Sequence, residues 1–306
     1  MGETIFGSSV GKCVACNNSN FSLWAQKSGP DGNIFNICRC SSCGSGFINP
    51  RPDSEYLKGI YQFSGHGLSG PVSVDEILDR ERKYPNSTVD GRRMISKAIE
   101  LMEKRITNRA LDIGSGYGFY SMQLLDTNFN VTAVNPGKWE NNVFEELNGF
   151  RPIEEYVEDL IFEEKYDLII MSQVLEHIDN VQGILLKIKS WLPCEGIMAI
   201  AVPNIDSIMV KLFGVKESGC LWVPEHLNYF SKRGLFRMLE LTGYQVVDYE
   251  PISRIPYDFL SKRLFLKGVI RNICNEVIKI TQKIPLSLAN LAGCGFYHNV
   301  WVKRND

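Results

Sequence analysis

Two pairs of cysteines near the N-terminus have the spacing of a metal site. They are Cys13-x-x-Cys16 and Cys40-x-x-Cys43, and two thiolates three positions apart can face one ion when the chain between them turns tightly. Four thiolates close a tetrahedron and leave no position for water, so the pattern predicts a structural zinc ion rather than a catalytic one. The alternatives are four reduced structural cysteines, or Cys38 as a substitute ligand.

A glycine-rich loop further along the chain has the layout of a ligand-binding turn. An apolar run that ends in Asp112 is followed by Gly114, Gly116 and Gly118, and the next residues, FYSMQLL, begin a helix. Backbone N–H groups can approach a ligand closely there because no Cβ holds it away. A dinucleotide loop, G-x-G-x-x-G, would require glycine where Phe119 stands. The alternative is a tight turn without a ligand.

Alternating strands and helices place this loop at one edge of a parallel sheet. The alternation, which begins at residue 109, predicts a mostly parallel sheet with helices on both faces, and ligands bind beyond the carboxyl ends of such strands. Asp112, Asn135, Ser172 and Pro203 stand at those ends. We expect further strands at 131–134, 166–171, 197–202, 244–249 and 296–302, and helices at 89–104, 138–147, 181–192 and 232–241.

The D-x-G-x-G-x-G pattern from Asp112 to Gly118 resembles motif I of the class I S-adenosylmethionine-dependent methyltransferases. Three later segments resemble one branch of that family, which contains ubiquinone-pathway and sugar methyltransferases. They are LEHI at 175–178, VPN at 202–204 and PEHLNYFS at 224–231. A cysteine-rich start before this domain is similar to sugar methyltransferases of polysaccharide and antibiotic pathways. The resemblance implies an α/β, Rossmann-like, mostly parallel seven-stranded sheet with helices on both faces, an N-terminal zinc ribbon and a helical C-terminal insertion.

The resemblance also implies which residues hold the cofactor, S-adenosylmethionine. In this chain they are Asp112, Gly114, Ser115, Gly116 and Gly118 of the loop, Asn135 at the second strand end, and Glu158 and Asp159 near the adenine. The family usually has Asp or Glu where Asn135 stands. An amide accepts hydrogen bonds from ribose without the charge that strengthens them, which predicts weaker cofactor binding. For each acidic residue near the adenine, solvated surface charge is the alternative.

Two Glu-His pairs are candidates for proton transfer. In related sugar C-methyltransferases the pair in the P-E-H-L loop is implicated as a base, and it corresponds here to Glu225 and His226. A histidine titrates near neutral pH and an adjacent carboxylate can hold its tautomer. The alternative for His226 is a structural hydrogen bond that holds the loop. His177 is a third candidate, although a structural role is favoured because E-H occurs there in relatives with different acceptors.

Composition limits the function classes. The 306 residues carry a net charge of −2 and 44% hydrophobic residues, which gives no case for binding nucleic acid. No secretory signal and no membrane-spanning run are apparent, so we expect a cytoplasmic location. We expect a zinc ribbon over 1–50, a linker or lid over 51–88 and the methyltransferase domain over 89–306. Within that domain, the basic amphipathic helix at 256–290 is expected to pack on the protein rather than on a membrane.

The sequence therefore predicts methyl transfer from S-adenosylmethionine to a small polar acceptor, a nucleotide-linked or glycan sugar. Three alternatives stay open. A lipid or quinone-like acceptor is favoured only by the basic helix at 256–290, and a non-catalytic binding module would use the zinc ribbon for a partner. A nicotinamide-dependent oxidoreductase is disfavoured by Phe119.

Overall fold

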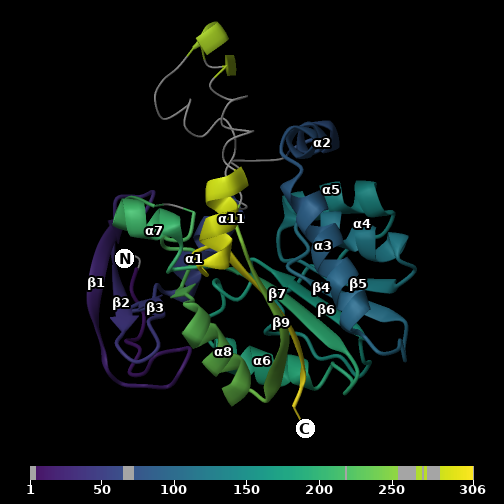
Figure 1. Ribbon diagram of the computed structural model, residues 1–306, viewed down its shortest axis with the longest axis horizontal. Helices are drawn as coiled ribbons and strands as arrows, with labels where there is room; N and C mark the ends of the chain where they lie inside the picture. Colours follow the sequence, from purple (N-terminus) through teal and green to yellow (C-terminus); the bar gives the residue numbers. More distant parts are fainter. Residues whose placement is uncertain are drawn as a thin grey trace.

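The structure is a computed structural model that describes residues 5–64, 72–217, 219–253, 267–270, 272–273 and 283–305. The described chain forms a six-stranded sheet and, beside it, a four-stranded sheet that carries the cysteine-rich N-terminal segment (Figure 1). Most of the helix expected at 256–290 lies outside the described residues. Among the described helices, none combines the length and hydropathy needed to cross a lipid bilayer.

The larger sheet has the order β5-β4-β6-β7-β10-β9. Its first four strands are parallel, and β10 runs antiparallel between β7 and β9, as expected for the last strand. The strands are β4 (Arg109–Ile113), β5 (Asn130–Val134), β6 (Leu168–Ser172), β7 (Ile197–Pro203), β9 (Tyr244–Ile252) and β10 (Tyr297–Arg304).

The prediction of seven strands is not confirmed, because the described residues form six in this sheet. Beyond β5, Ile153 makes one isolated parallel bridge to Val134. Its N–H donates to Ala133 O and its carbonyl accepts from Asn135 N–H. Pro152, which has no N–H to donate, precedes the bridge, and the acidic residues that follow have a low preference for strands.

Alternation along the buried strands divides the core into two layers. One face of the sheet packs Ala110, Leu168, Ile170 and other alternate residues against α3 and α4. The opposite face packs Leu111, Ile169 and their equivalents against α6 and α8. The helices are α3 (Asn86–Leu101), α4 (Phe119–Asp126), α5 (Lys138–Asn148), α6 (Val181–Lys189) and α8 (Lys232–Leu241). Figure 1 shows α3, α4 and α5 beside β4 and β5, with α6 and α8 at the other side.

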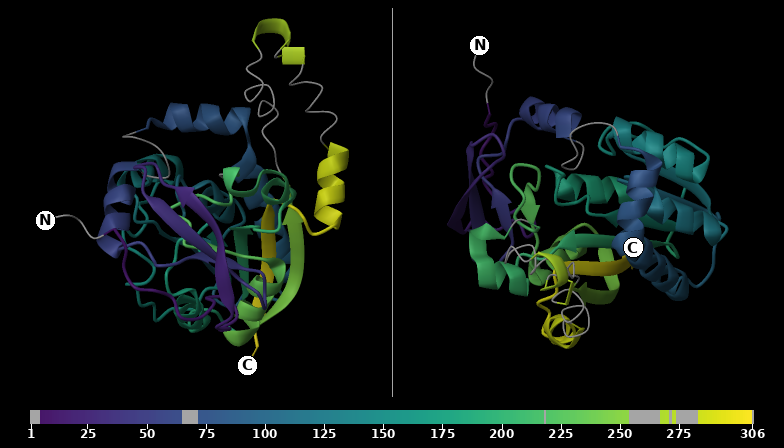
Figure 2. Two further views of the ribbon diagram at one scale, coloured as in Figure 1. Left: turned by 90° about the vertical axis from the view of Figure 1, so that its left-hand side faces the viewer. Right: turned by 90° about the horizontal axis from the view of Figure 1, so that it is seen from above.

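The cysteine-rich sheet has the order β1-β2-β3-β8. A hairpin joins β1 (Phe21–Ser28) to β2 (Ile34–Cys40) through the predicted turn, where Gly32 N–H donates to Gly29 O. The third strand is β3 (Gly46–Ile48), and the fourth, β8 (Asn228–Tyr229), comes from the second half of the chain. The two views in Figure 2 show this purple segment packed along one side of the larger sheet.

Short helices connect and flank the two sheets. The segment expected to be a linker or lid contains α1 (Ser54–Ser64) and α2 (Val74–Lys83), and Ser73 caps the latter by accepting from Glu76 N–H. After β7 the chain forms α7 (Ile208–Phe213) and the 3₁₀ turn Gly214–Lys216. Before β10 lies α11 (Lys283–Leu291), whose end meets α7 through the bond from Ile208 N–H to Cys294 O.

Candidate functional site

The four predicted metal ligands come together in the N-terminal sheet. The sulfur atoms of Cys13, Cys16, Cys40 and Cys43 all lie within 4.8 Å of one another. Both cross pairs, Cys13–Cys43 and Cys16–Cys40, have Sγ–Sγ distances of 3.6 Å. A tetrahedral zinc ion with Zn–S bonds of about 2.3 Å requires sulfurs about 3.8 Å apart, so the donor set fits such an ion. Cys38, the possible substitute, is outside this group.

The glycine loop after β4 needs glycine for two different physical reasons. Gly114, Gly116 and Gly118 all have positive φ, at 70°, 51° and 88°, a region that side chains with a Cβ rarely adopt. A Cβ on Gly114 would stand 2.4 Å from Val174 Cγ2, and one on Gly118 would stand 2.2 Å from Asn148 Nδ2. A Cβ on Gly116 would meet nothing within 4 Å. The middle of the loop therefore borders open space, as a ligand-binding turn requires.

Buried polar atoms without partners surround this loop. Ser115 Oγ, Tyr117 Oη and Glu140 Oε2 are buried and have no hydrogen-bond partner among the described residues. Because an unpaired buried polar atom costs about 1–3 kcal/mol, three of them around one loop fit a polar ligand. Glu140 also lies close enough to Tyr117 to affect its titration. Burial, followed by the negative charge of Glu140, raises the pKa of the Tyr117 hydroxyl to about 12. This set fits the ribose and amino-acid groups of S-adenosylmethionine.

Glu140 is a site residue that the sequence reasoning missed. It lies in the first turn of α5 and is only 2% exposed. Its Oε2 stands 2.3 Å, and Asn135 Nδ2 3.2 Å, from the point where Gly137 would carry a Cβ. Asn135 Nδ2 donates to Asn141 Oδ1 (2.8 Å) and Gly137 O (3.3 Å). The side-chain oxygen of Asn135, Oδ1, is therefore left to act as an acceptor. The sequence signal for this residue was its position: Glu140 follows Asn135, the expected acidic position, by five residues and Gly137 by three.

The remaining predicted cofactor residues have different surroundings. Asp112 is 2% exposed, and its Oδ2 accepts a 2.7 Å hydrogen bond from Ser121 Oγ of α4. Burial raises the pKa of this carboxyl to about 6. Glu158 and Asp159 lie on an exposed loop, and Lys187 Nζ donates to Glu158 O. Asp112 thus joins β4 to α4 beneath the loop, and contact of these three residues with the cofactor stays a prediction.

Both candidate histidines lie beside a buried glutamate. One donor atom each from Glu176, His177 and His226 lies within 4.8 Å of the others, and we call these residues the EHH cluster. The two imidazole rings meet edge to face with centroids 4.8 Å apart. Glu176 is fully buried, neither of its carboxylate oxygens has a hydrogen-bond partner among the described residues, and burial raises its pKa to about 8. The carboxylate that lies beside both histidines is that of Glu176, whereas the sequence reasoning paired His226 with Glu225.

Backbone carbonyls orient both imidazole rings. His177 Nδ1 lies 3.0 Å from Glu225 O, and His226 Nδ1 lies 2.7 Å from Cys220 O. A carbonyl oxygen only accepts, so each Nδ1 carries a proton and donates it to its carbonyl. Glu225 contributes this carbonyl, while its side chain is 4% exposed with a pKa raised by burial.

A network of hydrogen bonds clamps the two loops of the EHH cluster together. Leu227 N–H and Asn228 N–H both donate to Glu176 O, at 2.7 and 3.0 Å. The Asn228 amide donates to Leu175 O and Ile178 O. Such a doubly bonded clamp brings His226, which is far from His177 in sequence, to a fixed position.

Arg51 ties the N-terminal segment to the same clamp. It is 4% exposed and donates to Leu227 O (2.6 Å) and Asn228 Oδ1 (2.7 Å). Its Nε lies 2.8 Å from an oxygen of Asp179. A buried guanidinium with these partners positions the clamp, so the chain that leaves the cysteine-rich sheet supports the EHH cluster.

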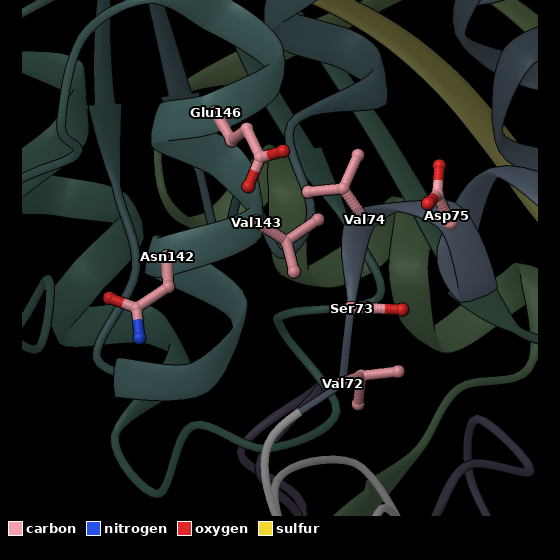
Figure 3. A pocket seen from close by; sticks show the side chains of 7 residues that line it. All are labelled: Val72, Ser73, Val74, Asp75, Asn142, Val143 and Glu146. Atoms are coloured by element: carbon pink, nitrogen blue, oxygen red, sulfur yellow. The ribbon is translucent and has the colours of Figure 1, made fainter.

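The EHH cluster and the glycine loop are neighbours. Val174, which follows β6 and contacts Gly114, precedes Glu176 by two residues. Both groups thus lie at the carboxyl ends of β4 and β6, where the alternation predicted a site. A separate hollow of about 190 Å³ lies between the start of α2 and α5. Figure 3 shows its lining side chains, which are Val72, Val74, Val143 and four polar residues. It contains neither histidine nor cysteine.

Comparisons with known proteins agree on one family. The sequence model of a methyltransferase domain matches residues 82–249. The chain is 28% identical over 189 residues to the ubiquinone biosynthesis O-methyltransferase of Rickettsia canadensis (strain McKiel), covering 58% of this chain and 72% of that protein. It is 29% identical over 188 residues to the protein of the same name from Rickettsia typhi, covering 58% and 69%.

Solved structures share the fold. The plantazolicin methyltransferase BpumL, in complex with SAH, superposes with a TM-score of 0.51 at 15% identity, covering 82% of this chain and 98% of that one. Magnesium protoporphyrin IX methyltransferase from Synechocystis PCC 6803, with bound SAH, gives a TM-score of 0.50 at 11% identity, covering 82% and 100%. At these identities the likeness concerns the fold alone.

Proposed function

The chain belongs to this methyltransferase family and is an S-adenosylmethionine-dependent methyltransferase, and from that premise we propose that it methylates a hydroxyl group of a quinone-like aromatic acceptor. The observation that carries the proposal is the EHH cluster, which stands beside the glycine loop at the ends of β4 and β6. The relatives named as ubiquinone biosynthesis O-methyltransferases support this acceptor class over a sugar.

Different residues in and beside the loop contact different groups of the cofactor. The open face of Gly116 admits the cofactor backbone, and Ser115 Oγ and Tyr117 Oη offer polar contacts there. The carboxylate of Glu140 and the carbonyl of Asn135 accept from the ribose hydroxyls, so that Glu140 supplies the charge that Asn135 lacks. When bound, S-adenosylmethionine supplies an electrophilic methyl group on a sulfonium.

The EHH cluster serves the acceptor. A hydroxyl group must lose its proton as the oxygen–carbon bond forms, and the imidazole rings of His177 and His226, which meet edge to face beside Glu176, assist that loss. Trp222 stands next to His226, with ring centroids 6.3 Å apart, and is 38% exposed. An exposed indole at the edge of the cluster offers a flat surface on which an aromatic acceptor can stack. Positioning the acceptor in line with the sulfonium supplies much of the rate.

A sugar acceptor is the second candidate. It is favoured by the P-E-H-L loop that carries His226 and by the cysteine-rich segment, which Arg51 connects to that loop. The zinc ion proposed for that segment would be structural, since four thiolates fill its coordination shell.

A radiolabel assay tests the proposal and separates the two acceptors. The protein is incubated with S-adenosylmethionine labelled in the methyl group and with matched panels of catechols, polyprenylated phenols and nucleotide sugars. We expect label in the phenolic panel. Label confined to sugars would contradict the proposed acceptor, and calorimetric titration with S-adenosylhomocysteine that showed no binding would contradict the cofactor site.

A further inference from the structure

One loop of the EHH cluster is hydrogen-bonded in two directions. We call this segment, residues 222–231, the His226 loop. Leu227 N–H and Asn228 N–H donate to Glu176 O, which belongs to the loop after β6 of the larger sheet. Leu227 O and Asn228 Oδ1 accept from Arg51, which follows the cysteine-rich sheet, at 2.6 and 2.7 Å. The position of the His226 loop therefore depends on both sheets.

The cysteine-rich sheet holds the end of the same loop through a strand and a turn. Ile48 N–H of β3 donates to Leu227 O (3.0 Å), next to the pairing of β3 with β8. Beyond β8, Ser231 Oγ donates to Cys43 O (2.6 Å), and Ser231 N–H donates to Ser45 Oγ (3.1 Å). Both serines are buried. Cys43 and Ser45 lie in the turn after β2, and Cys43 is one of the four cysteine ligands.

The first turn of α8 lies directly against this turn. Ser231 Oγ accepts from Gly234 N–H (3.0 Å) and so caps the helix. A Cβ on Gly234 would stand 1.9 Å from Ser45 Oγ and 3.2 Å from Cys43 Sγ. With no free space between them, a displacement of the turn that carries Cys43 must also displace Ser231 and the start of α8.

An ion at the cysteine site fixes that turn, because a structural zinc contributes folding free energy to the segment that binds it. The glycine loop depends on other contacts. Gly114 N–H and Ser115 N–H both donate to Val134 O of β5. Figure 1 shows β5 and β4 on the side of the molecule away from β1, β2 and β3. The two halves of the candidate site thus differ in their dependence on the cysteine-rich sheet.

We propose that the cysteine-rich sheet sets the position of the His226 loop, and that Arg51 and Ser231 make this position dependent on an ion at the cysteine site. Productive binding of the acceptor then requires the filled cysteine site, whereas binding of the cofactor does not. Arg51 and Ser231 are positioning residues, since they act through the loop that carries His226. Only the effect on the acceptor rests on the proposed function.

Hydrogen exchange tests the proposal without an acceptor. The full-length protein is measured as purified, after zinc removal by a strong chelator, and after zinc is restored, with the Kd for S-adenosylhomocysteine measured in each state. Zinc removal should unfold the cysteine-rich sheet and speed exchange of the Leu227 and Asn228 amides at least about tenfold, and restored zinc should reverse this. Exchange of residues 112–118 and the Kd should change less than about twofold.

Arg51→Lys tests the connection with the cysteine site still filled. Lysine keeps the charge but lacks the planar fork that bonds Leu227 O and Asn228 Oδ1 together. This variant should retain zinc and show the same faster exchange of the His226 loop. With a labelled acceptor from the panel, its KM for the acceptor should rise at least about tenfold while the KM for S-adenosylmethionine stays unchanged. Gln26→Ala, an exposed change on β1, should alter none of these quantities.

Two results would overturn the proposal. One is zinc removal that leaves exchange of the His226 loop unchanged. The other is zinc removal that speeds exchange of residues 112–118 equally, or abolishes S-adenosylhomocysteine binding, because the whole chain then unfolds together. These results come from the unaltered protein, so they decide the matter even if Arg51→Lys does not fold. If no acceptor in the panel takes label, the proposed function fails while the exchange data still test the positioning of the loop.

Discussion

Replacing Gly116 by alanine separates the ligand-binding role of the loop from its backbone conformation. The φ of Gly116 is 51°, and a left-handed conformation costs an L-residue about 1–2 kcal/mol. No atom lies within 4 Å of the added Cβ, so no clash adds to that cost. We expect the free energy of unfolding in urea to fall by this amount. If the open space holds the cofactor, the Cβ also displaces it, and the Kd for S-adenosylhomocysteine should rise at least about tenfold, or 1.4 kcal/mol.

Gly32→Ala is the matched control. Gly32 has a φ of 85° and equally open surroundings, but it lies in the hairpin turn between β1 and β2. It should lose similar stability while binding S-adenosylhomocysteine as before, as measured by calorimetry. If Gly116→Ala binds this ligand with unchanged affinity, the loop does not border the cofactor and the reasoning fails.

Four further outcomes are expected. Glu140→Gln should weaken S-adenosylhomocysteine binding about tenfold in calorimetry, because the ribose loses a charged acceptor, while Glu145→Gln on the same helix should not. His226→Ala should lower turnover by about a hundredfold with S-adenosylhomocysteine affinity retained, and a near-normal rate would reject its role. Metal analysis should find zinc that Cys40→Ser removes, with unfolding by strong chelators; a zinc-free, chelator-resistant protein would contradict this. Burial lowers the pKa of His298 to about 4, so the folded chain binds fewer protons than the unfolded chain below pH 6.5. The free energy of unfolding should therefore fall by up to about 3 kcal/mol as the pH is lowered toward 4. Denaturant titrations at several pH values should show no such contribution in His298→Gln.

The larger sheet could be predicted because each of its strands carries a local signal. Residues 166–171 and 197–202 are largely apolar segments bounded by turn residues, and they overlap the observed strands β6 (Leu168–Ser172) and β7 (Ile197–Pro203). The helix expected at 232–241 has those same bounds in the structure. The pattern of apolar segments predicted six strands, and the seventh was implied by the family resemblance alone; among the described residues, Ile153 pairs with β5 through a single bridge and no seventh strand forms in this sheet.

The site was predictable where chemistry follows from spacing and unpredictable where it follows from burial. The cysteine pairs and the glycine loop are recognisable in the sequence because their residues lie within a few positions of one another. The roles of Glu176 and Glu140 depend instead on the loss of solvent around each carboxylate, and that burial is made by segments distant in sequence. The pairing of His226 with Glu225 relied on adjacency, whereas the clamp from Leu227 and Asn228 sets Glu176 against both rings.

The pairing of β3 with β8 makes the order of synthesis matter. A ribosome releases the cysteine-rich segment first, yet the strand that completes its sheet, Asn228–Tyr229, emerges only after most of the larger sheet has been made. The nascent N-terminal segment therefore presents an open β3 edge throughout that interval. Early metal capture by its thiols would hold the hairpin in a defined shape until the late strand arrives, and a chain shortened before residue 228 would never close that edge.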